Sequence, residues 1–131
     1  MSAIQLGRID MTMDDVLAFL EKDLETLAGV DSPRLAFEVN LTLRTGMGDA
    51  YPLSIKVARS DVAEGRPYSF ETSHHAHTPD QISAYVTSVP YESSVLYAIH
   101  RAIETVKSYV DQAIQNGHPF DTSWLVPNPH Y

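Results

Sequence analysis

The chain contains no cysteine, and this absence removes several classes of protein at once. Disulfides, thiolate zinc sites, iron–sulfur clusters and cysteine nucleophiles are all excluded. The sequence also lacks a serine-hydrolase elbow, a Walker phosphate loop, a dinucleotide fingerprint and a kinase motif set. Because no standard catalytic motif is left, the sequence favours a protein that is not an enzyme.

Long apolar runs are missing as well. No stretch approaches the roughly 18 apolar residues that a membrane-spanning helix needs. The first ten residues show no charged segment followed by a long apolar one, so we expect no signal peptide. We therefore expect a cytoplasmic protein without a membrane partner.

Lysine and arginine are scarce in this acidic protein. The chain has 9 of them against 17 Asp and Glu, which gives a net charge of −8. Because contacts to phosphates need clustered cations, this balance predicts no nucleic-acid partner. The charge is uneven, however: residues 34–66 hold five Lys or Arg against four Asp or Glu, a local charge of +1. That segment could present cations to an anionic ligand.

The patterns that are present predict an α+β fold in a single domain, residues 1–131. A chain of 131 residues, 44% of them apolar, can bury its own core. Apolar and polar residues alternate over residues 34–44 and 51–58, which predicts two strands joined as an antiparallel hairpin. The favoured register places Glu38 opposite Lys56 and Asn40 opposite Ser54. Residues 67–72 and 3–9 predict a third and a fourth strand.

Helical periodicity predicts two longer helices and one short one. An N-terminal helix begins at a capping box in residues 12–15 and ends near Gly29. A second capping box, residues 78–81, predicts a short helix that continues through Val86. A long C-terminal helix covers residues 90–116. We expect the antiparallel sheet of three to four strands to pack on the N-terminal and the long C-terminal helix.

The length of the C-terminal helix predicts a homo-oligomer. About 26 helical residues span roughly 39 Å, whereas a seven-residue strand spans only roughly 23 Å. Part of the apolar stripe of the helix would then extend beyond the sheet, where a second chain could cover it.

Residues 117–131 form a C-terminal arm that is rich in proline and aromatic residues. The arm holds the only tryptophan of the chain, Trp124, where a frayed terminus would be polar. Its prolines favour an extended backbone. We expect the arm to fold back over its own core or to dock on a neighbouring subunit.

Three histidines lie within four positions at His74, His75 and His77. If the backbone is extended there, His75 and His77 point to the same side, as two ligands of one metal must. Glu71 or His100 could supply a third ligand for zinc or another divalent metal. The alternative is a solvated loop that happens to be rich in histidine, and the sequence favours this alternative.

The cationic hairpin and several aromatic residues form a second candidate site. Cationic side chains at Arg44, Lys56 and Arg59 could bind an anion, while aromatic rings with a polar group are frequent in binding clefts. The alternative is that the cations only protect the edge of the sheet. The candidate ligand-binding residues are Arg44, Lys56, Arg59, Tyr68, Tyr91 and Trp124.

Taken together, these features predict a non-enzymatic binding module, such as a regulator, an adaptor or a sequestering protein. It would bind a small, possibly anionic ligand or a protein partner as a homo-oligomer, without a cofactor. The alternative function is a metal-dependent hydrolase or lyase that uses the histidines of residues 74–77.

Overall fold

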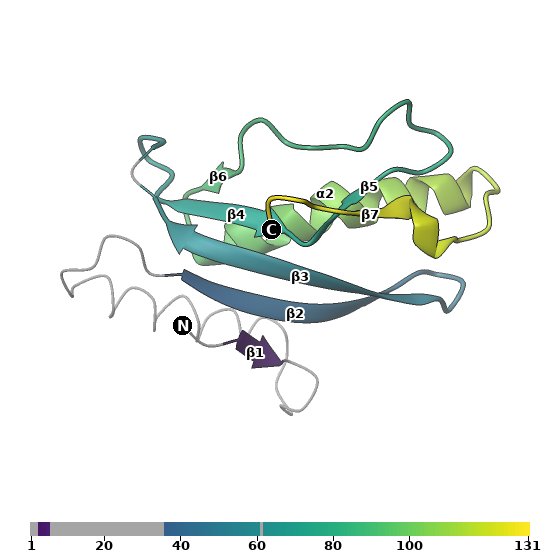
Figure 1. Ribbon diagram of the computed structural model, residues 1–131, viewed down its shortest axis with the longest axis horizontal. Helices are drawn as coiled ribbons and strands as arrows, with labels where there is room; N and C mark the ends of the chain where they lie inside the picture. Colours follow the sequence, from purple (N-terminus) through teal and green to yellow (C-terminus); the bar gives the residue numbers. More distant parts are fainter. Residues whose placement is uncertain (1–2, 6–35, 61) are drawn as a thin grey trace.

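The computed structural model describes residues 3–5, 36–60 and 62–131 (Figure 1). In this part of the chain one sheet, in the order β1-β2-β3-β4-β6, packs on a single long helix, α2. The α+β class and the antiparallel sheet are confirmed, while the expected N-terminal helix lies outside the described residues. The elements of this sheet and its helix are β1 Ala3–Gln5, β2 Ala36–Arg44, β3 Ala50–Arg59, β4 Tyr68–Thr72, β6 Tyr91–Glu92 and α2 Val95–Gln115.

The β2–β3 hairpin has the register that the sequence predicts. Glu38 lies opposite Lys56 and Asn40 opposite Ser54, and the Ser54 hydroxyl donates a hydrogen bond to the Asn40 side chain. β4 pairs antiparallel with β3, and β6 with β4. At the other edge, β1 joins β2 in parallel. Three residues, Ala3–Gln5, therefore form the fourth strand expected over residues 3–9.

Helix α2 is shorter than the sequence predicts, and this corrects the argument for an oligomer. The helix begins at Val95 because the Ser94 hydroxyl caps it, accepting from the Tyr97 N–H at 3.1 Å. Residues 91–92 belong to the sheet instead. The 21 residues of α2 span about 32 Å, and the ten residues of β3 span about 33 Å. The helix is thus no longer than the longest strand, and its apolar stripe is buried within the one chain, so its length no longer argues for a second chain.

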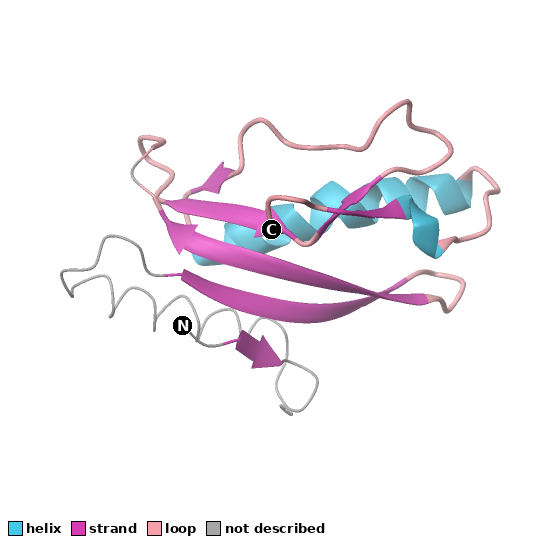
Figure 2. Ribbon diagram, in the orientation of Figure 1, coloured by secondary structure: helices cyan, strands magenta, loops and turns pink. Residues whose placement is uncertain are grey.

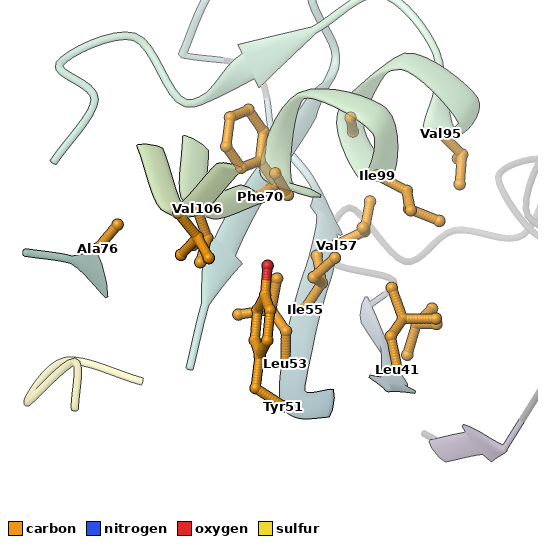
Figure 3. Close-up of a cluster of buried hydrophobic side chains, with 14 of the residues drawn as sticks. Leu41, Tyr51, Leu53, Ile55, Val57, Phe70, Ala76, Val95, Ile99 and Val106 are labelled. Carbon is orange, nitrogen blue, oxygen red and sulfur yellow. The ribbon is translucent and has the colours of Figure 1, made fainter. Parts of the chain in front are cut away.

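The hydrophobic core lies between α2 and one face of the sheet (Figure 3). Alternate residues of β3 point into it, including Leu53, Ile55 and Val57, which are almost completely buried. α2 contributes a stripe of small and β-branched residues that is also inaccessible to solvent. The apolar face that the period of two creates on the strands therefore packs against the apolar face that the period of 3.6 creates on the helix. The helical members of the stripe are Val95, Ala98, Ile99, Ala102, Val106, Val110 and Ala113.

Residues 77–90 form one long loop where the sequence predicts a short helix, and Figure 2 shows it as an arch from β5, His74–Ala76, to β6. The capping contacts do form: the Thr78 N–H donates to the Gln81 side chain at 2.8 Å, and the Asp80 N–H lies 3.4 Å from the Thr78 hydroxyl. The helix fails to continue because the Tyr85 N–H donates back to the Ala76 carbonyl. A tertiary hydrogen bond thus replaces the next helical turn.

The C-terminal arm folds back over its own chain. β7, Leu125–Pro127, pairs antiparallel with β5, His74–Ala76, in a second small sheet. Before it, the 3-10 helix Thr122–Trp124 buries the tryptophan. The Phe120 ring packs edge-on against Trp124, at 5.6 Å between centroids, and stacks on Tyr51 at 5.4 Å. These contacts join the arm to the core of the same chain.

Candidate functional site

A pocket of about 170 Å³ lies beside the outer edge of β4. It brings together the histidine-rich segment, the C-terminal arm and the 77–90 loop, which are far apart in the sequence. The pocket is therefore a product of the tertiary structure. Its lining residues are Phe70, Glu71 and Thr72 of β4, His75 of β5, Tyr85, Val86, Thr87 and Pro90 of the loop, Thr105 of α2, and Asn128 and His130 of the arm.

A row of three side chains on one side of α2 holds the 77–90 loop away from the helix and so leaves space for the pocket. Arg101, Thr105 and Tyr109 are spaced four residues apart and therefore lie on one side of the helix. Arg101 binds one end of the loop, and the Tyr109 ring packs on Tyr85 at 4.8 Å between centroids. Thr105, the smallest of the three, lines the pocket. A small side chain between two large ones leaves the hollow.

Arg101 fixes the loop where it returns to the sheet. Its Nη1 donates to the Val89 carbonyl at 2.8 Å and to the Glu92 carboxylate at 3.0 Å. Its Nη2 donates to the Thr87 hydroxyl at 3.2 Å, and the guanidinium lies over the Phe70 ring at 5.3 Å. A planar group with several donors can hold three neighbouring residues at once. Arg101 thereby shapes one wall of the pocket without lining it.

Asn128 fixes the arm at the other end of the pocket. Its backbone N–H donates to the Ser73 carbonyl and its side-chain Nδ2 to the Thr72 carbonyl, each at 2.9 Å. Its Oδ1 accepts from the His130 N–H at 2.9 Å. One asparagine thus connects the arm to the end of β4 and to Ser73, which directly precedes β5.

His75 is held in its neutral form at this junction. Partial burial lowers the pKa of its imidazole below the ordinary value of 6.5, and the side chain of Asn128, as an acceptor for the ring N–H, and the carboxylate of Glu71 oppose this shift only in part. The nearby imidazoles of His130 and His74 lower the pKa further. At neutral pH, His75 therefore offers the pocket an uncharged ring with one donor and one acceptor nitrogen.

The arm ends on the polar face of the sheet, at Lys56. The Lys56 Nζ donates to the Tyr131 carbonyl at 2.7 Å and lies 4.0 Å from the centre of the Tyr131 ring. The Tyr131 hydroxyl donates to the Glu38 carboxylate. Burial, and then this hydrogen bond, raise the pKa of the Tyr131 phenol. Lys56 is therefore occupied by the arm of its own chain.

The structure does not bring the expected cations together. Arg44 ends β2, whereas Arg59 ends β3, at the opposite end of the same hairpin. Nine residue steps of a strand separate these ends by about 30 Å. Lys56 in turn is bound to Tyr131 of the arm. The three cations therefore do not line one cleft.

The aromatic candidates also fall at separate places. Trp124 is buried in the core, and Tyr68 is buried under Arg59, whose guanidinium lies 5.7 Å from the ring centre. Tyr91 belongs to β6, opposite Ser69. Of these residues, Arg59, Tyr68 and Tyr91 are neighbours at one end of the sheet. None of the six predicted ligand-binding residues lines the pocket.

The histidines of the metal hypothesis are spread along an extended segment. His74 lies in β5 with its Nδ1 2.9 Å from the Ser73 hydroxyl, while His75 faces the pocket. The His77 N–H donates to the Trp124 carbonyl, so the extended backbone continues to His77. In residues 36–60 and 62–131, no three His, Asp or Glu side chains are grouped as a metal site requires.

Sequence reasoning singled out His75 but missed Arg101, Asn128 and most of the pocket. Two signals were available. Asn128 lies between Pro127 and Pro129, where a polar residue in a stiff, extended segment is well placed to make fixed hydrogen bonds. Arg101 is the first of three polar residues spaced four apart along the helix, which indicates a packed segment beside that side of the helix. Neither signal says which segment is bound.

Comparison with known proteins adds no family. No protein-family model, curated protein or solved structure matches the chain. Among the described helices, none is both long and apolar enough to cross a membrane. The chain is thus defined by its α+β fold and by a pocket at the edge of β4.

Proposed function

We propose that this protein is a non-enzymatic binding module that takes a small ligand in the pocket beside β4. The observation that carries the proposal is the convergence of His75, Tyr85, Asn128 and His130 from three distant segments on one pocket. Pockets that combine apolar walls with a few fixed polar groups are typical of ligand-binding sites. The geometry supports recognition in a site that is formed before the ligand arrives.

The anchors of the pocket support binding with little rearrangement. Arg101 holds the loop on one side, and Asn128 holds the arm on the other. A second tie lies at the far end of the loop, where the Asp80 carboxylate binds His118 at 2.9 Å and Asn116 at 2.8 Å. Preorganised walls reduce the entropy lost on binding, which favours affinity for a small molecule.

The lining favours an uncharged ligand over the anion considered from the sequence. Glu71 belongs to the lining, and no Lys or Arg does among the described residues. An anion would therefore find no cationic side chain in the lining to compensate its charge. An anionic ligand could bind instead at the Arg59 end of the sheet, but the pocket itself suits a neutral molecule with an apolar part.

A fragment screen tests the proposed function. Saturation-transfer NMR with neutral fragments should reveal binders whose signal is lost in Val86→Trp, because an indole at this pocket-lining position fills the hollow. Val62→Trp is the matched control, since Val62 is similarly exposed but does not line the pocket. If no fragment distinguishes the two variants, the pocket is not a binding site.

The remaining expectations from the sequence are kept as proposals with their own measurements. A metal-dependent hydrolase or lyase would carry stoichiometric metal when purified without a tag, and it would lose that metal when His75 and His77 are changed to alanine. Light scattering on the protein as it elutes from a size-exclusion column measures its molar mass and so tests for the homo-oligomer. A protein partner and a cytoplasmic location rest on the sequence alone.

A further inference from the structure

The edge of β4 that faces the pocket has two backbone groups without a partner in the sheet. The Ser60 N–H donates to the Pro67 carbonyl and the Ser73 N–H to the Ser54 carbonyl, so odd-numbered residues of β4 face β3. Because the direction alternates along an antiparallel strand, Phe70 and Thr72 direct their backbone groups outward. The bonds from the Phe70 N–H to Pro90 and from Asn128 to the Thr72 carbonyl confirm that direction.

Pro90 prevents the loop from completing this edge. In an antiparallel pair, two opposite residues exchange both of their backbone hydrogen bonds. The Pro90 carbonyl accepts from the Phe70 N–H at 3.0 Å, but proline has no N–H to return to the Phe70 carbonyl. The next loop residues turn away, since the Val89 N–H donates to Thr87 and the Val89 carbonyl accepts from Arg101.

Two polar groups are therefore left at the wall of the pocket: the Phe70 carbonyl and the Thr72 N–H. Neither has a hydrogen-bond partner among the described residues. Both residues are only 5% exposed, and a buried backbone group without a partner is costly. The acceptor, the Phe70 carbonyl, precedes Glu71, and the donor, the Thr72 N–H, follows it. In a parallel pair of strands, a single residue opposite Glu71 would bond to both groups, with its own N–H to the carbonyl and its own carbonyl to the N–H.

We propose, building on the binding function proposed above, that the ligand carries one amino-acid residue of extended backbone with an amide bond on each side. Its N–H donates to the Phe70 carbonyl, and its carbonyl accepts from the Thr72 N–H. Pro90 closes the slot at one end and Asn128 at the other, so the slot holds one residue of extended backbone. The apolar part of the ligand lies against Val86 and Tyr85. The ligand class is thus a small, uncharged amide, such as a blocked amino acid.

The proposal is tested with N-acetyl-valine methylamide as the probe. We expect a dissociation constant of roughly 1 to 10 mM, as is typical for so small a ligand, and a downfield shift of the Thr72 amide proton in nitrogen-15 correlation spectra. An ester analogue in which oxygen replaces the valine N–H should bind roughly tenfold more weakly, because one hydrogen bond is lost. Val86→Trp should abolish binding, and Val62→Trp should leave it unchanged.

Other outcomes separate this proposal from the proposed function. If neutral fragments bind in a manner that Val86→Trp removes, but the amide and its ester bind equally well, the pocket binds ligands and the amide inference is wrong. If no compound distinguishes Val86→Trp from Val62→Trp, both proposals are wrong. A five-residue blocked peptide with a central valine should bind at least tenfold more weakly than the probe. Tighter binding of the peptide would overturn the one-residue slot in favour of a longer strand.

Discussion

The β2–β3 hairpin and the layer that forms the pocket are built in different ways. In the hairpin, every second residue enters the core, and the partners are joined by a short turn. In the pocket layer, β5, the 77–90 loop and the arm are positioned by single polar residues from remote elements, above all Arg101 and Asn128. The hairpin is stabilised by many repeated contacts, whereas the layer depends on few. We therefore expect the two regions to respond differently to substitution.

The largest effect is expected in the hairpin. Ile55 lies at the centre of β3 and is completely buried under α2. Ile55→Ala should lower the free energy of unfolding by about 3 to 4 kcal/mol, because it removes buried methyl groups and leaves a cavity. Urea denaturation followed by circular dichroism measures the change. Ile82→Ala in the exposed loop is the control and should change stability by less than about 0.5 kcal/mol. Comparable losses in both variants would remove the distinction between the regions.

A smaller effect with a local signature is expected at Arg101. Arg101→Ala should lower the free energy of unfolding by about 1 to 3 kcal/mol, since several hydrogen bonds from one charged group are lost together. Hydrogen exchange should accelerate in residues 87–92 and stay unchanged in β3. Lys107→Ala, which breaks an exposed ion pair on the same helix, should cost about 0.5 kcal/mol and leave loop exchange unaltered. Protection of the loop in Arg101→Ala would show that the anchor is dispensable.

A substitution at Tyr51 should raise the free energy of unfolding, whereas the two substitutions above lower it. Its hydroxyl lies within the apolar core and has no hydrogen-bond partner among the described residues (Figure 3). Burial, and to a smaller extent the charge of Asp111, raise the pKa of this phenol, so it stays uncharged. Tyr51→Phe should stabilise the protein by about 1 kcal/mol, because an unsatisfied polar group is removed while the stack on Phe120 is kept. Tyr131→Phe, which loses a hydrogen bond to Glu38, should destabilise. Thermal melts compare the two, and a destabilised Tyr51→Phe protein would imply a partner for the hydroxyl.

The smallest effect is a pH dependence of the pocket layer. The pKa of His75 is lowered in the folded state, so the unfolded chain binds its proton first as pH falls below about 6.5. The contribution of His75 to stability is therefore present above that pH and is lost as pH falls through the folded pKa. Denaturation at pH 7.5 and 5.5 should show less loss in His75→Gln than in the unchanged protein. The carboxylates of Asp80 and Asp121, whose pKa values are also lowered, act only in a more acidic range. Equal losses in both proteins would assign the dependence to other groups.

Prediction from sequence succeeded where local periodicity and burial coincide. Alternation along β2 and β3 predicted both strands and their register, because a shift by one residue would turn every apolar side chain to the polar face. The same reasoning failed for residues 78–86, where a helix start is present but Tyr85 bonds to Ala76 and packs on Tyr109. It also placed the start of α2 too early, because residues 91–92 complete the edge of the sheet.

The candidate site was predictable only in part. The clustered histidines drew attention to His75, and the aromatic arm to residues 117–131, and these two segments do meet at the pocket. The cationic residues of the hairpin were grouped by their sequence positions. In an extended hairpin, however, cationic residues of the same short segment can lie up to about 30 Å apart, and this distance separates Arg44 from Arg59.

The sequence by itself determined the α+β class, the hairpin register and the apolar faces, because these follow from backbone periods that act over a few residues. Only the tertiary structure decided where the pocket lies. Two of its walls meet through the contact between Thr72 and Asn128, and the arm that carries Asn128 is also held by Lys56 at Tyr131. Such contacts depend on where a whole element lies in space, and no local pattern encodes which partner a single polar side chain will reach. The scarcity of cations noted at the outset has a structural counterpart in a pocket whose described lining contains no Lys or Arg.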